Sequence, residues 1–327
     1  MRIGALFALT LLLPLASCKG GDQATTTTGQ PKYRIAMIPK GTTHEYWKSV
    51  HEGADKAAKE FGVDLIWKGP LKEDDRADQI KVVEQFTLDK VDGICLAPLD
   101  DTALVSYVKD AESSGIPVAI FDSGLKYDDV VSYVATDNYA AGGIAGTEMG
   151  KLLDGKGKVI VLRYNEGSAS TTDRENGFID AAKKAGLEIA SDEQFAGVTV
   201  ETAQDASENL LTRFKQGNGL SVQGIFCPNE SSAFGMLRAL QDTGLAGKVK
   251  FIGFDASQKL IEGLTSGQID GLIVQNPRKM GYETIKAIVD KIKGGTPEKR
   301  IDTGATFVTK ANMETDEVKQ LLAPPTD

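Results

Sequence analysis

Polar side chains that can each form several hydrogen bonds follow the short apolar runs in which strands are predicted. The first run, residues 34–38, is followed by Lys40, His44 and the adjacent aromatics Tyr46 and Trp47, of which Trp47 has a single N–H donor. Carboxylate or amide side chains follow four later runs, namely Asp122, Asn229, Asp255 and Gln275. Residues of these types can bind a ligand that carries several hydroxyl groups.

This combination has the chemistry that a sugar ring requires, because the C–H faces of the ring are apolar and its rim carries hydroxyls. Aromatic side chains can cover a ring face, while planar carboxylate and amide groups can bind neighbouring hydroxyls in pairs. Taken singly, each strand-end residue can also be an ordinary loop or helix-cap residue. Trp47 can also be a core residue, since it begins the apolar stripe of a predicted helix. The presence of Lys40 and His44 beside the aromatic pair favours a binding site.

Short β-rich runs alternate with amphipathic segments of helical length from Tyr33 onward, which predicts parallel βαβ units. The predicted strands cover residues 34–38, 64–67, 93–97, 118–121, 158–162, 224–227, 250–253 and 271–274. The predicted helices cover residues 45–61, 76–88, 102–113, 139–153, 172–184, 201–214, 231–243 and 277–293. Residues 42–45, Thr-Thr-His-Glu, have the pattern of a capping box at the start of the first helix.

These elements are too many for one domain of ordinary size, so we expect an α/β protein with two doubly wound parallel-sheet lobes. The first βα series ends near residues 134–138, and a second begins with the helix predicted at 139–153. In open parallel sheets, ligands bind beyond the carboxyl ends of the strands. The residues that follow the strands are therefore the candidates for a binding site.

The composition limits the class of protein. Of the 327 residues, 41% are hydrophobic and 25% are charged, which is typical of a globular protein. Acidic residues outnumber basic ones by 46 to 37, giving a net charge of -9, so nucleic acid is not an expected partner. The charged segment 72–76, Lys-Glu-Asp-Asp-Arg, is interpreted as a solvated loop and helix start.

The sequence lacks the motifs of enzymes that commonly use such folds. The segment 150–156 approaches a phosphate-binding loop, but Gly157 stands where Ser or Thr should bind magnesium, and a predicted strand follows. A Gly-x-Ser-x-Gly nucleophile elbow is absent from the sequence. The two histidines, His44 and His51, cannot form a His-rich metal site. We therefore expect a protein that is not an enzyme, with no catalytic residues, no metal and no cofactor.

The N-terminal residues have the features of an export signal and are excluded from the fold. Arg2 precedes an apolar stretch, residues 3–15, that is shorter than the roughly 20 residues needed to span a bilayer. Leu-Ala-Ser-Cys, ending at Cys18, resembles a bacterial lipobox, in which the cysteine is lipidated and becomes the new N-terminus. An ordinary secretory signal followed by a chance cysteine is the alternative. We expect a lipoprotein signal peptide at 1–17 and a flexible tether at 18–32.

The other two cysteines, Cys95 and Cys227, each lie inside a short apolar run. Free cysteine is commonly a small buried hydrophobe, and both residues are interpreted in this way. A disulfide between them remains open as the alternative.

Nine short motifs occur in the order found in bacterial periplasmic sugar-binding proteins like the ribose-binding protein. They are Ile-Ala-Met-Ile-Pro-Lys (35–40), the aromatic pair, Ala-Pro-Leu-Asp (97–100), Pro-Val-Ala-Ile-Phe-Asp (117–122), Thr-Asp-Asn (136–138), Asp-Arg-Glu-Asn-Gly-Phe (173–178), Asn-Glu (229–230), Gly-Phe-Asp (253–255) and Gln-Asn-Pro (275–277). The chain resembles this family from Tyr33 to Val308. It departs from the ribose-type pattern at Lys40, His44 and Ser123. Its Ile-Pro-Lys and Lys-Gly-Pro (68–70) segments resemble the branch that includes autoinducer-2 and rhamnose-type binding proteins.

The resemblance implies a type I binding protein, with two lobes joined by three hinge crossings near Thr136, Gln275 and Thr303. The implied N-terminal lobe is 33–136 plus 276–304, and the implied C-terminal lobe is 137–275 plus 305–327. The implied function is capture of a sugar or sugar-like polyol and its delivery to an ABC permease, by a monomeric periplasmic lipoprotein. A ligand-sensing module for a membrane receptor kinase or chemoreceptor is the alternative.

The resemblance also assigns roles to the candidate site residues. The first lobe would bind sugar hydroxyls through Asp122, and the second lobe would do so through Arg174, Asn229 and Asp255. Gln275 would lie at a hinge and reach the ligand. The other first-lobe residues of the expected ligand-binding set are Lys40, His44, Tyr46 and Trp47, of which the two aromatics would flank the sugar.

We expect Cys18→Ala to abolish membrane attachment and leave ligand binding intact, because the variant lacks the thiol that would carry the lipid. Membrane fractionation of cells that express the variant and the wild type checks this. A variant that stays in the membrane fraction would contradict the lipobox prediction.

Overall fold

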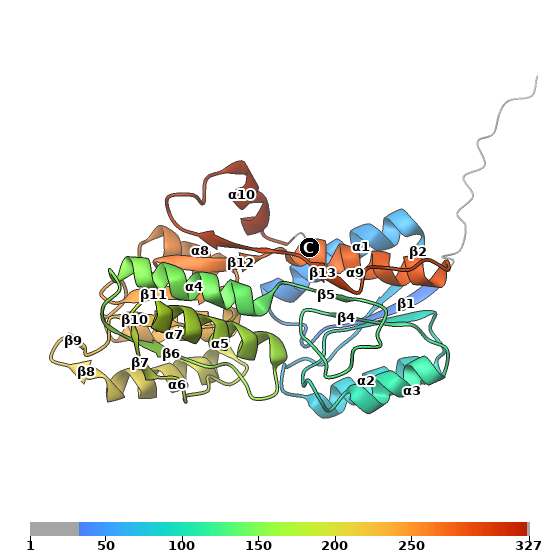
Figure 1. Cartoon of the computed structure of the whole chain (residues 1–327), viewed down its shortest axis with the longest axis horizontal. Helices are drawn as coiled ribbons and strands as arrows, with labels where there is room; N and C mark the ends of the chain where they lie inside the picture. Colours follow the sequence, from blue (N-terminus) through green and yellow to red (C-terminus); the bar gives the residue numbers. More distant parts are fainter. Residues whose placement is uncertain (1–32, 326–327) are drawn as a thin grey trace, which may run out of the picture. The chain divides into compact units, whose positions relative to one another are not determined.

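The computed structural model describes residues 33–325, so the predicted signal peptide, the predicted tether and Cys18 lie outside the described residues. Two six-stranded sheets dominate the chain (Figure 1). The first has the order β13-β5-β4-β3-β1-β2, and all of its strands are parallel. Its strands are β1 (Tyr33–Ile38), β2 (Val63–Trp67), β3 (Gly93–Leu96), β4 (Val118–Phe121), β5 (Tyr133–Ala135) and β13 (Arg300–Asp302).

The second sheet has the order β14-β12-β11-β10-β6-β7 and is parallel except for the antiparallel pair β12 and β14. Its strands are β6 (Lys158–Val161), β7 (Glu188–Ser191), β10 (Gly224–Phe226), β11 (Lys250–Phe254), β12 (Gly271–Gln275) and β14 (Ala305–Val308). A separate antiparallel pair is formed by β8 (Lys215–Gln216) and β9 (Gly219–Leu220). We call each six-stranded sheet with its helices a lobe.

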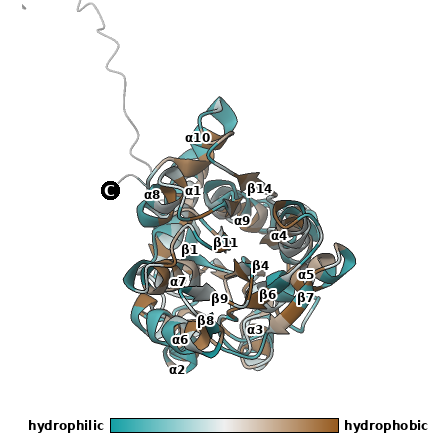
Figure 2. Cartoon of the chain, turned by 90° about the vertical axis from the view of Figure 1, so that its left-hand side faces the viewer, coloured by the Kyte–Doolittle hydropathy of each residue, from teal (hydrophilic) through white to brown (hydrophobic). Residues whose placement is uncertain are grey.

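Helices cover both faces of each sheet. In the first lobe, α1 (Glu45–Phe61) and α9 (Pro277–Ile292) pack on one face, and α2 (Arg76–Leu88) and α3 (Val105–Ser113) pack on the other. Successive β1 residues alternate between the two cores, as side chains of a strand must: Ile35 and Met37 lie in one core, and Ala36 and Ile38 lie in the other. Figure 2 shows the helices around the strands, with hydrophilic residues on the outer part of α6.

The second lobe repeats this arrangement. On one face lie α4 (Asn138–Leu152) and α5 (Ala169–Lys184). On the other lie α6 (Val200–Arg213), α7 (Glu230–Asp242) and α8 (Gln258–Thr265), with α10 (Asp316–Leu322) beside them. The expected architecture of two doubly wound parallel-sheet lobes is therefore confirmed.

The chain crosses between the sheets after β5, after β12 and between β13 and β14. Residues of the three crossings are hydrogen-bonded to one another. The Thr136 hydroxyl donates to Gln275 Oε1 at 2.9 Å and lies 3.4 Å from the hydroxyl of Thr303. All three side chains are buried. The crossings therefore form one connected hinge region, at the three places that the sequence predicts.

All sixteen predicted elements, eight strands and eight helices, are present, with ends that shift by at most three residues. The helices predicted at 45–61 and 76–88 agree with α1 and α2 at both ends. Six strands and two helices were not predicted, and each is short: β5, β7, β8, β9, β13, β14, α8 and α10.

The predicted capping box is wrong. The N-cap residue of α1 is His44, and its side chain makes no capping hydrogen bond. Cys95 and Cys227 are free, buried thiols in different lobes, so the disulfide between them does not form. Within residues 33–325, no helix is long and apolar enough to cross a membrane.

Paired glycines let two helices in each lobe pack backbone against backbone. A Cβ added to Gly142 of α4 would lie 2.0 Å from the carbonyl oxygen of Arg174 in α5. One added to Gly281 of α9 would lie 2.0 Å from the carbonyl oxygen of Val50 in α1. Any larger residue at these positions would have to separate the helices.

We expect Gly142→Ala to lower the free energy of unfolding by about 1–3 kcal/mol or more, because rigid backbone occupies the space that the methyl group needs. Gly143→Ala is the matched control, since its Cβ would meet only one carbonyl oxygen, at 3.9 Å. The control should be neutral or stabilising by about 0.5–1 kcal/mol, because it removes a glycine from a helix. Urea unfolding measures both variants, and equal stabilities would contradict the role of Gly142.

Candidate ligand-binding cleft

The carboxyl ends of both sheets face a small cavity with a volume of about 20 Å³. Its lining contains all nine residues of the expected ligand-binding set, namely Lys40, His44, Tyr46, Trp47, Asp122, Arg174, Asn229, Asp255 and Gln275. Four further residues complete the lining: Glu73, Ser170, Thr171 and Glu230. The fold therefore brings the strand-end residues of both lobes to one place, which we call the cleft.

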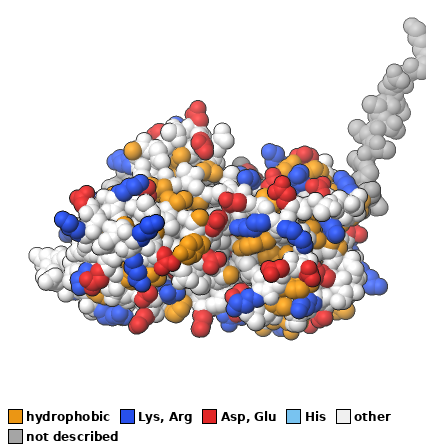
Figure 3. Space-filling view, in the orientation of Figure 1, with side chains coloured by type: hydrophobic (Ala, Val, Ile, Leu, Met, Phe, Trp, Pro, Cys, Tyr) orange, Lys and Arg blue, Asp and Glu red, His pale blue; other side chains and the backbone are white. Residues whose placement is uncertain are grey.

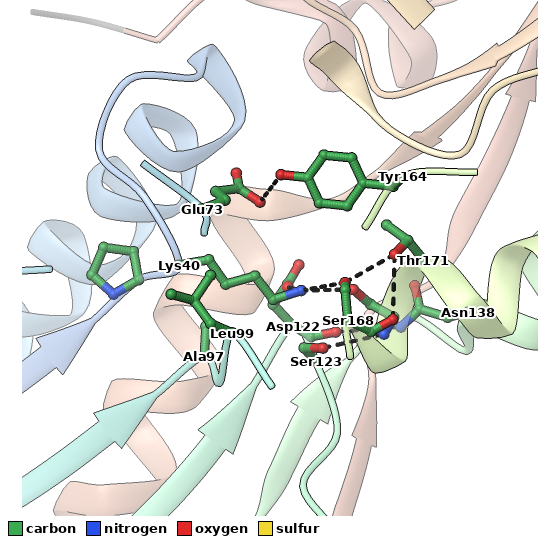
Figure 4. Close-up of polar contacts among 12 residues, drawn as sticks. Lys40, Glu73, Ala97, Leu99, Asp122, Ser123, Asn138, Tyr164, Ser168 and Thr171 are labelled. Atoms are coloured by element: carbon green, nitrogen blue, oxygen red, sulfur yellow. Dashed lines mark hydrogen bonds and ion pairs between the residues drawn. The ribbon is translucent and has the colours of Figure 1, made fainter. Parts of the chain in front are cut away.

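Lys40 connects the two lobes from the end of β1. Its Nζ donates to the hydroxyl oxygens of Ser168 and Ser170, at 3.2 and 2.9 Å, where α5 begins (Figure 4). It also lies 3.3 Å from Asp122 Oδ2. Because an ammonium group has three N–H donors, these partners use all of them. The side chain is 3% exposed, and its charge is thus satisfied by the protein itself.

Asp122 and Asp255 occupy corresponding positions, immediately after β4 in one lobe and after β11 in the other. Both have left-handed backbone conformations, with φ of 61° and 69°. Such conformations are uncommon outside glycine, and they cluster at functional sites. The strained turns aim two carboxylates into the cleft from opposite sides.

Each of these carboxylates is held by protein donors. Asp122 Oδ1 accepts a hydrogen bond from the Tyr46 hydroxyl at 2.7 Å. Asp255 accepts from Gln275 Nε2 at 2.7 Å and from the backbone N–H of Glu230 at 3.0 Å. Burial raises the pKa of Asp255, with Arg174 and the Gln275 hydrogen bond acting against it. Every carboxylate oxygen has further lone pairs, so both groups can accept from a ligand as well.

Arg174 lies on α5 and is 3% exposed. Its guanidinium packs over the ring of Phe254, 3.9 Å from the centroid, in a cation–π contact. Nε donates to Asn138 Oδ1 at 2.8 Å, and Nη1 donates to the carbonyl oxygen of Pro228 at 3.0 Å. Within residues 33–325, Nη2 has no hydrogen-bond partner, and the residue lines the cavity. Arg174 is thus a fixed group with spare donors.

Asn229 and Gln275 are engaged mainly in structural hydrogen bonds. Asn229 is the N-cap of α7, where its side chain accepts from the backbone N–H of Ser232 at 3.2 Å. Its role as a helix cap was one of the two interpretations that the sequence left open. Gln275 ends β12 and connects Thr136 of the hinge to Asp255 of the cleft.

Trp47 belongs to the core of the first lobe and also lines the cavity. It belongs to the core between β1 and α9 and is 3% exposed. Its ring makes edge-on contacts with Tyr46 and Phe121, at centroid distances of 5.0 and 6.3 Å. The indole Nε1 donates to Glu73 Oε1 at 2.7 Å, which orients the ring at the cavity wall.

The interpretation of segment 72–76 as a solvated loop is wrong for Glu73. Lys72, Asp74 and Asp75 are exposed, as expected, but Glu73 is 8% exposed and lines the cavity. Its Oε1 lies 2.8 Å from His44 Nδ1. Burial is the largest single influence and acts against both charges, but the attraction and hydrogen bond between the two groups, together with their other neighbours, outweigh it, raising the pKa of His44 to about 9 and lowering that of Glu73 to about 2. The two groups form a buried ion pair.

Two glutamates outside the expected ligand-binding set cap helices of the opposite lobe. Glu230 of α7 accepts from the backbone N–H groups of Glu45 and Tyr46 in the first turn of α1, at 3.3 and 3.1 Å. Glu45 in turn accepts from the backbone N–H of Gln258, the first residue of α8, at 3.1 Å. A carboxylate near a helix N-terminus is stabilised by the unpaired N–H groups there. Burial nevertheless raises the pKa of Glu230 to about 7.

The chemistry of the cleft is that of hydrogen bonding. It offers carboxylate acceptors, guanidinium and imidazole donors, and the side chains of Tyr46 and Trp47. Among the described residues, no group of three or more metal-ligating side chains could hold an ion. Acidic and basic side chains are interspersed on the face drawn in Figure 3, which shows no broad basic area.

Comparison with known proteins places the chain among binding proteins. Residues 35–296 match the family described as periplasmic binding protein domain. The D-allose-binding periplasmic protein of Escherichia coli is 29% identical over 268 residues, which cover 80% of this chain and 85% of the relative. The ribose import binding protein of Salmonella typhimurium is 28% identical over 284 residues, covering 87% and 93%.

Solved structures agree in fold. A carbohydrate transporter solute-binding protein from Agrobacterium radiobacter, in complex with D-arabinose, has 34% identity and a TM-score of 0.84, covering 90% of this chain and all of the other. An ABC transporter solute-binding protein from Agrobacterium vitis with bound D-fucose has 35% identity and a TM-score of 0.83, covering 88% and 99%. The fold class and the family that the sequence predicts are confirmed, and the chain belongs to the periplasmic binding protein family, with the type I fold.

Proposed function

We propose that this protein captures a sugar or sugar-like polyol between its lobes and delivers it to an ABC permease. The observation that carries the proposal is the convergence of three fixed polar groups on one cavity. Asp122 comes from the first lobe, and Arg174 and Asp255 come from the second. Their spare acceptors and donors match the hydroxyl rim of a sugar, and the aromatic pair matches its apolar faces.

The balance of charge in the cleft favours an uncharged ligand. Lys40 is paired with Asp122, His44 is paired with Glu73, and burial raises the pKa of Asp255, with the charge of Arg174 acting against this. Glu230, the remaining carboxylate, has a pKa raised to about 7 and is held by two backbone N–H groups. Apart from the spare donors of Arg174, the charged groups of the site are already engaged, so a charged ligand would find few partners there, and burying a poorly paired charge is costly. Neutral hydroxylated molecules meet no such cost.

The relatives support this class of ligand and the transport role. By their names, one relative binds D-allose and another serves ribose import. D-Arabinose and D-fucose occupy two of the similar solved structures. All four are monosaccharides that present several neighbouring hydroxyls. We assign the same class of ligand to this cleft.

The location and the lobe boundaries are part of the same proposal. The protein would act as a monomer in the periplasm, anchored to a membrane by lipid on Cys18. Its lobes would comprise 33–136 with 276–304, and 137–275 with 305–327. The membership of the two sheets supports these limits, since β13 joins the first sheet and β14 joins the second.

Ligand entry would require the lobes to separate. A cavity of about 20 Å³ has room for little more than a water molecule. The lobes meet through hydrogen bonds across the cleft, such as those from Lys40 to Ser168 and Ser170, while three crossings join them at the hinge. A ligand that contacts both lobes only when they are closed would shift the population toward closure. The permease would then recognise the closed form.

We expect Asp122→Asn and Arg174→Ala each to weaken sugar binding about tenfold or more, since each leaves ligand groups unpaired at about 1–3 kcal/mol per group. Asparagine also tolerates the left-handed backbone at position 122. Calorimetry measures the effect with whichever of D-ribose, D-allose, D-arabinose and D-fucose binds the wild type most tightly. Asp110→Asn and Arg34→Ala, which alter exposed residues, are the controls. Unchanged dissociation constants for both site variants would refute the assignment.

We also expect the radius of gyration in solution scattering to fall when that sugar is added at saturation, because the lobes approach each other. Scattering from the same protein with a sugar that does not bind is the control. An unchanged profile at saturation would mean that the ligand binds without closure of the lobes.

A further inference from the structure

Glu73 is a buried carboxylate in a loop whose other charged residues face solvent. It precedes α2 of the first lobe and is 8% exposed, whereas Lys72, Asp74 and Asp75 are exposed. A carboxylate in such a position is costly unless it is paired and hydrogen-bonded. Its position therefore depends on its partners.

The partners of Glu73 come from both lobes. Oε1 accepts a hydrogen bond from Trp47 Nε1 at 2.7 Å and lies 2.8 Å from His44 Nδ1, both at the start of α1. Oε2 accepts a hydrogen bond from the Tyr164 hydroxyl at 2.9 Å. Tyr164 follows β6 of the second lobe and is 1% exposed (Figure 4). One carboxylate thus holds two members of the expected ligand-binding set and one residue of the opposite lobe.

The pairing with Glu73 decides what His44 can offer to a ligand. With Nδ1 bound to a carboxylate and the ring positively charged, Nε2 carries a proton and is a donor. A neutral ring with its proton on Nδ1 would instead present Nε2 as an acceptor. Within residues 33–325, Nε2 has no hydrogen-bond partner, and His44 lines the cavity. Glu73 therefore makes His44 a donor toward the cavity.

The other carboxylates around His44 favour its charged form, as Glu73 does. Glu73 faces it from the loop before α2, Glu230 from the start of α7, and Asp255 from the end of β11, and all three raise its pKa. Lys40, from the end of β1, acts on Glu73 and lowers the pKa of that carboxyl. Carboxylates therefore face the imidazole from both lobes.

We propose that Glu73 is the positioning residue of the cleft, which fixes the orientation of Trp47, keeps His44 as a charged donor, and bonds to Tyr164 when the lobes are closed. The part of this inference that concerns ligand specificity rests on the proposed sugar-binding function. The part that concerns the protonation of His44 is independent of that function.

The first experiment follows the histidine C–H resonances by NMR as the pH of the ligand-free protein is changed. The sequence contains only two histidines, so His51 serves as the internal control. We expect the midpoint of His44 to lie near 9 in the wild type and to fall by one or more pH units in Glu73→Gln. Asp74→Asn, the same change of charge at the neighbouring exposed residue, should leave it in place. A wild-type midpoint below 7, or an equal midpoint in Glu73→Gln, would overturn the proposal.

The second experiment measures the dissociation constant between pH 5.5 and 8, with the tightest-binding sugar of the panel D-ribose, D-allose, D-arabinose and D-fucose. In Glu73→Gln, affinity should be at least tenfold weaker than in Asp74→Asn at pH 8. The gap should narrow at pH 5.5, where His44 is protonated even without the carboxylate. Glu230 titrates in the same range and the charge of His44 lowers its pKa, so the pH dependence of the gap reports the charge of His44 both directly and through Glu230. A gap that is independent of pH would contradict the role assigned to the charge of His44.

Tyr164→Phe tests the hydrogen bond across the cleft independently of the charge of His44. It removes the hydrogen bond to Glu73 and leaves the ion pair, so affinity should fall severalfold with no change in the His44 midpoint. Unaltered affinity would overturn the cross-lobe part of the proposal. If no sugar of the panel binds the wild type, the proposed ligand class fails, while the NMR titration still decides whether Glu73 controls His44.

Discussion

The need to satisfy buried charge in the cleft is the constraint on which the rest of the site depends. Lys40 and Glu73 are each less than a tenth exposed, and an unpaired charge at that depth would oppose folding. Each has partners from both lobes: Lys40 bonds to Asp122 and to two serines of the second lobe, and Glu73 bonds to His44, Trp47 and Tyr164. All of these protein partners are in place only when the lobes meet, and water would have to replace those of the second lobe when the lobes separate.

Backbone N–H groups at the helix ends that face the cleft also find partners in the opposite lobe. Glu230 satisfies N–H groups of α1, and Glu45 satisfies one of α8, so each lobe supplies a carboxylate to a helix of the other. Water can replace these carboxylates at a helix end, since exposed N–H groups and carboxylates are both well hydrated. Such contacts can therefore break and form again at modest cost. They suit lobes that must open to admit a ligand and then close.

The sequence predicts the elements with strong local signals and misses those that depend on distant partners. Helix α1 has a regular apolar stripe and ends at Gly62 in a left-handed conformation, so its limits can be predicted. Strands β5 and β13 have three residues each; β5 pairs with the nearby β4 as well, but β13 pairs with β5 across more than 160 residues of sequence. Strand-end position was enough to find Asp122 and Asp255. It could not find Glu73, whose bonded partners Trp47 and Tyr164 lie 26 and 91 residues away.

The hinge and the cleft are joined by single hydrogen bonds. Gln275 accepts from Thr136 at the hinge and donates to Asp255 in the cleft. On the other side, Asn138 accepts from Arg174 and donates to the carbonyl oxygen of Asp122, at 3.3 Å, linking ligand-facing groups of the two lobes at the first crossing. Both linking side chains are buried, so breaking their hydrogen bonds would leave polar groups unpaired. A rotation about the hinge must therefore alter the bonds that orient Asp255 and Arg174, so the groups proposed to bind ligand acquire their full set of contacts only in the closed arrangement.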